Sequence, residues 1–313
     1  MKAAPEGASH DTLGRRALLG GLLGAAVAAS CDRADPRSRS TASSAPAAKG
    51  PWREWSFSAT EHYPHAAHAV VLAKRQSPLL VALHGRGEAS RGLVTGARGW
   101  RDDYDLGRAN RRLANPPLEP KDLLGFVRRE RLAALNASLK RHPFRGITVA
   151  CPFTPALADR SLEGARPFGA FVVKDLVAKA RKELELPPQR ERVGIDGVSM
   201  GGRLALLVGL SHPDVFGAVA ALQPAIGAGD VGWLSELAAK AQSSHRTHLR
   251  LVTSDDDYFR SAVETLSERL DRDGVKHELL VTPGPHDYVY NRGPGSFEML
   301  LWHDRVLHGL PPP

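Results

Sequence analysis

The sequence predicts one large α/β domain with a mostly parallel central sheet and helices on both faces. Short apolar runs alternate with helical patterns from residue 77 onward. The run at residues 146–151 has no polar face beyond one threonine, which is typical of a strand covered on both sides. A chain of 313 residues is also long enough to bury a substantial core.

The predicted sheet begins with an antiparallel hairpin at its edge, formed by residues 53–59 and 67–74. Further apolar runs predict strands at residues 77–83, 146–151, 192–196, 248–253 and 275–282. Helices are predicted at residues 169–185, 201–211, 259–273 and 296–308. In the first of these helices, apolar residues recur at helical spacing from Val172 to Leu184. The last ends at Gly309, shortly before three prolines.

Residues 1–31 predict an export signal that is not part of the fold. Arg15 and Arg16 precede an uncharged run of apolar and small residues at 17–30, which resembles a twin-arginine signal and is too short to span a bilayer. The run ends at Cys31 in a sequence similar to a bacterial lipobox, so both lipidation of Cys31 and simple cleavage stay open. We expect a flexible linker at residues 32–50 and a protein exported to the bacterial periplasm or cell envelope.

Charge and cysteine content exclude two other classes of protein. Lys and Arg number 42 against 34 Asp and Glu, a net charge of +8, but the excess is dispersed and no nucleic-acid-binding module accompanies it. We therefore expect no nucleic-acid partner. The two cysteines are Cys31 and Cys151, and Cys151 falls in a predicted buried strand, so disulfide bonds are not expected to stabilise the fold.

The most informative motif is GVSMGG at residues 197–202, between the predicted strand 192–196 and the predicted helix 201–211. It contains G-x-S-x-G, the nucleophile-elbow pattern, in which a tight turn between strand and helix exposes the serine hydroxyl. The glycines leave room for strand and helix to approach, and the helix N-terminus presents backbone N–H groups to a developing negative charge. Ser199 is thus the candidate nucleophile.

A second signal follows the predicted strand 77–83, which leads directly into His84-Gly85-Arg86. Hydrolases with a nucleophile elbow build the other half of their oxyanion hole in a loop at this position. We therefore expect the backbone N–H groups of Arg86 and Met200 to be the two oxyanion donors.

Candidates for an acid and a base come later in the chain, in the order expected of a Ser…Asp…His triad. Three aspartates, Asp255, Asp256 and Asp257, follow the predicted strand 248–253, and each could either face the site or cap the next helix. His286 lies in a Pro/Gly loop after the last predicted strand. In such a triad the histidine accepts the serine proton and the aspartate holds the correct tautomer.

At these residues the chain resembles the esterase D-type serine esterases of the α/β-hydrolase superfamily. The likeness extends over roughly residues 77–88 and 145–308, and its most specific segments are 197–202, 211–221, 224–225 and 284–288. The resemblance implies an α/β-hydrolase catalytic domain, here residues 51–310, that acts on esters or thioesters without metal or cofactor. It also implies that the second acid of a Gly-x-Asp-Asp loop is the triad member, which is Asp257 here, with Asp256 as the alternative because Ser254 replaces the glycine.

We therefore predict an exported serine esterase with the triad Ser199, Asp257 and His286, whose partners are a small or polymeric ester and, through Cys31, a membrane. The alternatives are an acyltransferase or a serine peptidase with the same triad, and a non-catalytic envelope binding protein on a hydrolase scaffold. Residues 89–144 match no pattern, and we expect them to shape the substrate pocket. Five large side chains could line that pocket, although core packing is the favoured role: Trp100, Tyr104, Leu106, Phe126 and Tyr288.

Overall fold

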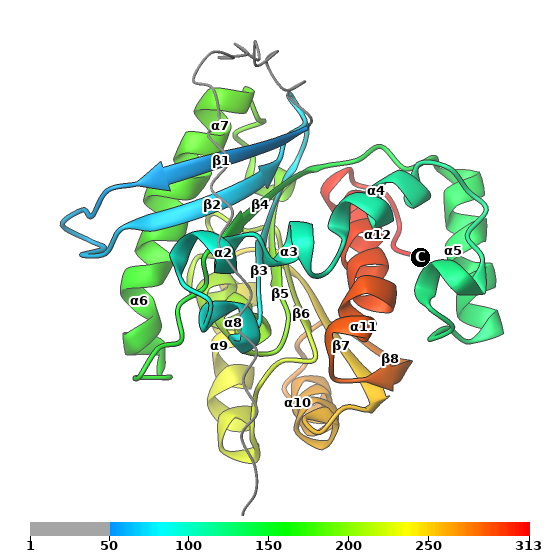
Figure 1. The fold of residues 1–313 in the computed structure, drawn as a ribbon. Coiled ribbons are helices and arrows are strands. Elements are labelled where there is room, and N and C mark those ends of the chain that lie inside the picture. Colours follow the sequence, from blue (N-terminus) through cyan, green and yellow to red (C-terminus); the bar gives the residue numbers. More distant parts are fainter. Residues whose placement is uncertain (1–50) are drawn as a thin grey trace, which may run out of the picture. The chain divides into compact units, whose positions relative to one another are not determined.

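The computed structural model describes residues 51–313 (Figure 1). The predicted export signal, the linker and Cys31 therefore lie outside the described residues. Within residues 51–313, no helix combines the length and the apolar character that crossing a membrane requires.

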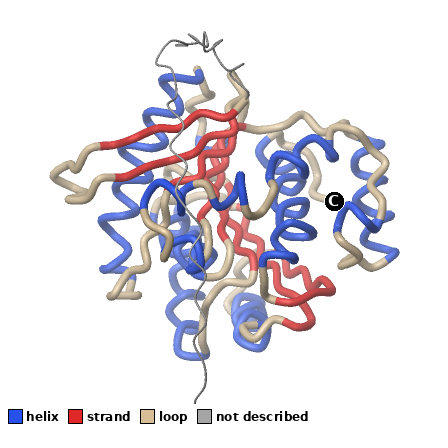
Figure 2. The backbone as a smooth tube through the Cα atoms, in the orientation of Figure 1, coloured by secondary structure: helices blue, strands red, loops and turns tan. Residues whose placement is uncertain are grey.

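Strands from the whole described chain form one sheet (Figure 2, red). Its strands are β1 (Trp52–Phe57), β2 (Ala67–Leu72), β3 (Leu79–Leu83), β4 (Thr148–Pro152), β5 (Val193–Gly197), β6 (Ala218–Leu222), β7 (His248–Asp256) and β8 (Glu278–Pro285). Their spatial order is β1-β2-β4-β3-β5-β6-β7-β8. The pairs β1–β2 and β2–β4 are antiparallel, and every later pair is parallel. The predicted edge hairpin and mostly parallel sheet are thus confirmed.

Helices cover both faces of the sheet (Figure 1). The longer ones are α4 (Leu106–Leu113), α5 (Arg129–Arg141), α6 (Leu162–Phe171), α7 (Ala178–Leu184), α8 (Met200–Ser211), α9 (Val231–Ser244), α10 (Arg260–Arg272) and α12 (Ser296–Leu307). Short helices are α1 (Arg86–Ala89), α2 (Leu93–Ala97), α3 (Gly99–Asp102) and α11 (Tyr288–Tyr290). The remaining elements are three 3-10 turns and two π turns. The 3-10 turns are Pro120–Leu123, Arg190–Arg192 and Ala228–Asp230, and the π turns are Val172–Val177 and Asn291–Gly295.

The core lies on both sides of the sheet because successive strand residues point to opposite faces. In β3, Val81 packs in the cluster that contains residues of α6 to α10, whereas Leu80 and Ala82 pack in the cluster built with α4, α5 and α12. In β4, Cys151 is fully buried, and this burial raises the pKa of its thiol. Strands buried on both faces explain why these sequence runs lack polar alternation.

Several elements differ from the sequence expectation. The predicted helix 169–185 begins earlier, at Leu162, and reaches Leu184 through the π turn Val172–Val177. Strands β7 and β8 extend to Asp256 and Pro285, beyond the predicted ends at 253 and 282, because these added residues continue the pairing past an irregularity between Ser254 and Asp256. Strand β6 and helix α9 were not predicted.

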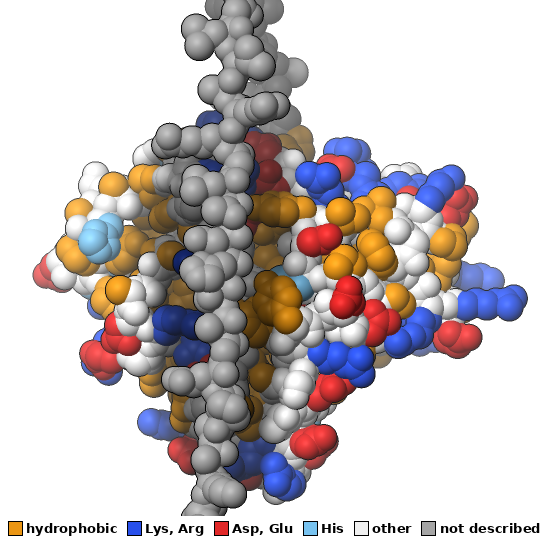
Figure 3. Space-filling view, turned by 60° about the horizontal axis from the view of Figure 1, so that its bottom comes forward, with side chains coloured by type: hydrophobic (Ala, Val, Ile, Leu, Met, Phe, Trp, Pro, Cys, Tyr) orange, Lys and Arg blue, Asp and Glu red, His pale blue; other side chains and the backbone are white. Residues whose placement is uncertain are grey.

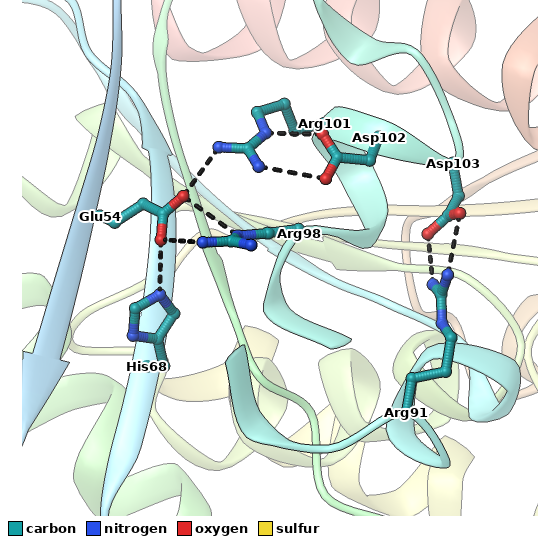
Figure 4. Close-up of polar contacts among 7 residues, drawn as sticks. All are labelled: Glu54, His68, Arg91, Arg98, Arg101, Asp102 and Asp103. Carbon is teal, nitrogen blue, oxygen red and sulfur yellow. Dashed lines mark hydrogen bonds and ion pairs between the residues drawn. The ribbon is translucent and has the colours of Figure 1, made fainter. Parts of the chain in front are cut away.

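The segment 89–144, which matched no pattern, forms α2 to α5. A charged network fastens its first part to the edge hairpin (Figure 4). Glu54 of β1 accepts hydrogen bonds from Arg98 Nη2 at Oε2 (2.9 Å) and from Arg101 Nη1 at Oε1 (2.9 Å), and His68 Nε2 lies 3.2 Å from Oε2. The hydrogen bond from Arg98, followed by those from Arg101 and His68, outweighs burial and lowers the pKa of Glu54 to about 2.

Candidate active site

The nucleophile elbow joins the carboxyl end of β5 to the N-terminus of α8. Ser199 has φ 55° and ψ −117°, a left-handed conformation that is strained for a residue with a side chain. Hydrogen bonds hold it there: its N–H donates to Leu222 O (2.9 Å), and its carbonyl accepts from Ala225 N (2.9 Å). A Cβ on Gly201 would lie 2.4 Å from Leu83 O, so β3 and α8 approach more closely than any other residue would permit. The predicted elbow geometry is therefore present.

His286 lies between Ser199 and Asp257. Its Nε2 is 3.0 Å from Ser199 Oγ, and its Nδ1 is 2.8 Å from Asp257 Oδ1. Because an ionised carboxylate only accepts hydrogen bonds, Nδ1 carries the proton and Nε2 is free to accept one from the serine. The structure thus brings the three predicted residues together from the ends of β5, β7 and β8.

Only one of the three candidate aspartates contacts the histidine. Asp257 is 6% exposed, its Oδ2 accepts from Thr253 Oγ1 (2.7 Å), and its Oδ1 also accepts from Phe259 N (2.9 Å). Asp255 and Asp256 are exposed. Asp255 accepts from Gly284 N (2.9 Å) at the neighbouring strand. Asp257 is therefore the carboxylate that can orient His286.

The loop after β3 is held by His84, which is fully buried. Its Nδ1–H donates to Gly85 O (2.9 Å), and its Nε2 accepts from Thr154 N (2.9 Å), an arrangement that requires the neutral imidazole. Burial lowers the pKa of His84 to about 4, in agreement with that arrangement. The side chain therefore fixes the loop that leads into Arg86.

Arg86 and Met200, the predicted oxyanion donors, are the first residues of α1 and α8. The first N–H groups of a helix have no acceptor inside the helix. Both residues line a cavity of about 550 Å³ that also contains Ser199. Arg86 and Met200 therefore lie, together with Ser199, at the wall of one cavity, where their N–H groups have no acceptor within their helices.

The cavity is lined by residues that follow β4, β6 and β7, as well as by the elbow. Pro155, Ala156 and Leu157 come from the loop after β4, and Tyr258 and Phe259 follow Asp257. Tyr258 is 71% exposed, and its ring centroid lies 4.3 Å from that of His286. Figure 3 shows the described domain from the lower side of Figure 1, with hydrophobic side chains gathered near the middle of the face and most of the visible basic side chains toward its right-hand part.

The expectation that residues 89–144 shape this pocket is wrong for the cavity beside Ser199, because none of them lines it. Trp100, Tyr104 and Leu106 pack in the core, as favoured. Phe126 lines a separate cavity of about 230 Å³. Tyr288 is 41% exposed and its ring lies 5.8 Å from that of Tyr104.

Sequence reasoning missed the lining residues Arg160, Arg203 and Ala225. Arg160 follows β4, Ala225 follows β6, and Arg203 lies in the first turn of α8. Ligands of open α/β sheets bind beyond the carboxyl ends of the strands, so these positions could have been proposed as lining residues on that general ground. Within residues 51–313, no group of three or more His, Cys, Asp or Glu side chains is arranged to hold a metal ion.

Comparison with known proteins agrees with this geometry. The family model described as "Esterase: Putative esterase" matches residues 156–290, which contain Ser199, Asp257 and His286. A ferulic acid esterase structure is 16% identical, with a TM-score of 0.59 over 82% of this chain and 98% of that chain. S-formylglutathione hydrolase (FrmB) from Staphylococcus aureus is 14% identical, with a TM-score of 0.56 over 81% and 98%.

The enterobactin esterase FES from Shigella flexneri is 16% identical, with a TM-score of 0.52; the match covers 80% of this chain and 60% of that one. No curated protein matches the sequence significantly. The solved structures show that this chain shares the fold of these esterases, an α/β-hydrolase fold with a mostly parallel sheet, and residues 156–290 are similar to the Esterase family model.

Proposed function

We propose that this protein hydrolyses a carboxylic ester through a covalent acyl-enzyme on Ser199. The observation that carries the proposal is the chain of two hydrogen bonds from Ser199 Oγ through His286 to Asp257. Ser199 Oγ attacks the acyl carbon while its proton passes to His286 Nε2. The imidazolium then gives this proton to the oxygen of the leaving alcohol, and the acyl group stays on Ser199.

The negative charge that develops on the carbonyl oxygen needs two donors. We assign this role to the backbone N–H groups of Arg86 and Met200, with the helix N-terminus of α8 adding its partial positive charge. Water then attacks the acyl carbon and gives a proton to His286, which passes it to Ser199 Oγ as the bond to the acyl group breaks and the acid is released. Asp257 stabilises the imidazolium at both stages and keeps the proton on Nδ1 between them.

The test uses the purified protein, p-nitrophenyl esters of increasing acyl chain length, acetylated sugars and feruloyl esters. Ser199→Ala should lower kcat by about 10⁶, the scale seen when a triad nucleophile is removed. A fluorophosphonate probe should label the wild type once and the variant not at all. Retention of most esterase activity by Ser199→Ala would reject the mechanism.

Product analysis separates hydrolysis from acyl transfer, which uses the same triad. With a sugar added as acceptor, the hydrolase releases the free acid, whereas an acyltransferase would yield the acylated sugar. A protein that turns over no ester and takes no label would instead be a non-catalytic binding protein.

We also propose that the protein is exported and anchored to a membrane. Support comes from the sequence alone: Arg15 and Arg16, the apolar run 17–30 and Cys31. An acyl chain on Cys31 would tether the catalytic domain through residues 32–50. The enzyme would then act on esters in the periplasm or cell envelope.

A further inference from the structure

The cavity beside Ser199 is lined by three arginines, Arg86, Arg160 and Arg203, and by no aspartate or glutamate. Within residues 51–313, neither Arg86 nor Arg160 forms an ion pair, although most arginines of this domain do. An excess of cationic side chains without acidic partners at a cavity wall attracts anions. The third arginine, Arg203, does have an acidic partner, Asp230.

Arg203 forms an ion pair with Asp230, and its guanidinium lies 5.4 Å from the ring centroid of Trp233. Burial raises the pKa of Asp230, but the hydrogen bond from Arg203, with a smaller contribution from the charge of Arg160, leaves that pKa below its usual value. Asp230 is not among the residues that line the cavity. Its single charge balances Arg203 and leaves Arg160 and Arg86 uncompensated.

The geometry also fixes Arg160 at the cavity. Its Nη2 donates to Ala225 O (2.9 Å), and its own carbonyl accepts from Arg203 Nη2 (3.0 Å). The N–H of Ala225 in turn donates to the carbonyl of Ser199. Arg160 is therefore tied at both ends to residues next to the nucleophile, with donors of its guanidinium still available.

Arg203 is the third arginine of the cavity wall, and it is only 7% exposed. Its charge is paired with Asp230, and its Nη2 donates to the carbonyl of Arg160. Arg203 therefore holds Arg160 in place and leaves the guanidinium of Arg160 as the group that meets a ligand.

We infer that this enzyme prefers an anionic ester, one that carries a carboxylate close to the scissile bond, with Arg160 as a specificity-determining residue. The inference rests on the proposed ester hydrolysis and names its substrate class. Arg160 binds the substrate carboxylate through its free N–H donors, and the charge of Arg86 adds to the attraction. Leu157, Leu204 and Phe259 provide the apolar part of the cavity for the rest of the molecule.

Matched pairs of esters test the inference. For the acid part, mono-p-nitrophenyl succinate is compared with p-nitrophenyl butyrate; for the alcohol part, 4-(butyryloxy)benzoate is compared with its uncharged amide. The measured quantity is the ratio of kcat/KM for the charged ester to that for the neutral one. In the wild type this ratio should exceed one in at least one pair and should fall as salt is added.

Arg160→Gln should lower that ratio by about fivefold, which is the most that one exposed ion pair usually contributes to binding. Arg160→Lys keeps the charge and should retain part of the preference for the charged ester. Arg166→Gln is the matched control, because Arg166 is exposed on α6 and pairs with Glu163; it should leave the ratio unchanged. Melting temperatures of both Arg160 variants check that the fold survives loss of the bond to Ala225.

A wild-type ratio at or below one in both pairs, or an equal ratio in wild type and Arg160→Gln, would overturn the inference. If neutral esters are still hydrolysed and Ser199 is still labelled in that case, the proposed function stands. If neither the charged nor the neutral esters are hydrolysed and no label appears, the proposed function fails and the inference fails with it.

Discussion

Thr253 donates a hydrogen bond of 2.7 Å from its Oγ1 to Oδ2 of Asp257, four residues further along the same chain. Both side chains are buried, and the bond crosses the point where β7 ends. The hydroxyl occupies the carboxylate oxygen that does not face His286, so the other oxygen is directed at the imidazole. This contact separates Asp257 from its two neighbours.

Substitution of the three aspartates should give two kinds of result. Asp257→Asn should lower kcat by about 10⁴, because the amide offers His286 the wrong hydrogen-bonding partner. Asp255→Asn and Asp256→Asn remove exposed charges and should cost at most about 2 kcal/mol of stability with little loss of rate. Measurements of kcat and melting temperature on all three variants separate the outcomes; a large rate loss at Asp256 with Asp257 unaffected would reject the assignment.

Thr253→Val should weaken the enzyme without abolishing it. The substitution keeps the shape but leaves Asp257 Oδ2 buried without its donor, which costs about 1–3 kcal/mol of stability. We expect a loss in kcat well below that of Asp257→Asn, because Asp257 still contacts His286 and Phe259 N. Thr253→Ser keeps the hydroxyl and serves as control. Equal kcat values for the valine and serine variants would show that the hydroxyl does not position Asp257.

Gly201→Ala should damage both the elbow and the oxyanion loop. The added methyl would lie 2.4 Å from Leu83 O and 2.5 Å from His84 O, and backbone atoms cannot move aside cheaply. We expect a loss of about 1–3 kcal/mol, despite the better helix propensity of alanine, together with a fall in kcat. Gly229→Ala is the control, because its methyl would meet nothing within 4 Å. A Gly201→Ala enzyme with wild-type stability and rate would contradict the close approach of β3 and α8.

Acidification should destabilise the fold through His84. Its pKa is lowered by burial from 6.5 to about 4, so above pH 6.5 the folded and unfolded states are both neutral at this residue. Between pH 6.5 and 4 the unfolded chain takes up a proton that the folded protein excludes, and stability falls by up to roughly 3 kcal/mol. The free energy of unfolding, measured with denaturant at a series of pH values, gives the slope of stability against pH. This slope should be smaller in His84→Gln than in the wild type and unchanged in a variant of the exposed His65. Identical slopes in wild type and His84→Gln would reject the assignment.

Full-length protein in a suitable Gram-negative host should be found in the membrane fraction and carry radioactive palmitate. Cys31→Ala should remove the label, and replacement of Arg15 and Arg16 by lysine should block export. Soluble, unlabelled protein in the periplasm would leave export standing and reject the lipid anchor.

The sequence was sufficient where the signal is local. The strands around residues 77–83 and 192–196 are continuous apolar runs, and Ser199 stands in a glycine pattern that few other structures require. The choice among Asp255, Asp256 and Asp257 is different. It depends on the irregularity of β7 against β8, which determines the side to which each carboxylate turns.

The substrate cavity could not be derived from local patterns. Arg160 lies 39 positions before Ser199, and it is folding of the loop after β4 that brings it to the elbow. Trp100 and Tyr104 are apolar enough for either a pocket or a core, and only the docking of α3 and α4 against β3 decides between these roles. Residue type alone cannot make that distinction.

Cys151 gives the domain a built-in reporter of unfolding. Among residues 51–313 it is the single cysteine, and its thiol is inaccessible and kept protonated by the interior of β4. A thiol reagent can react with it only after the sheet opens, so the labelling rate measures the population of opened molecules rather than surface reactivity. In a Cys31→Ala background this measurement would need no added probe, and it would rank the variants described above under conditions in which the enzyme remains active.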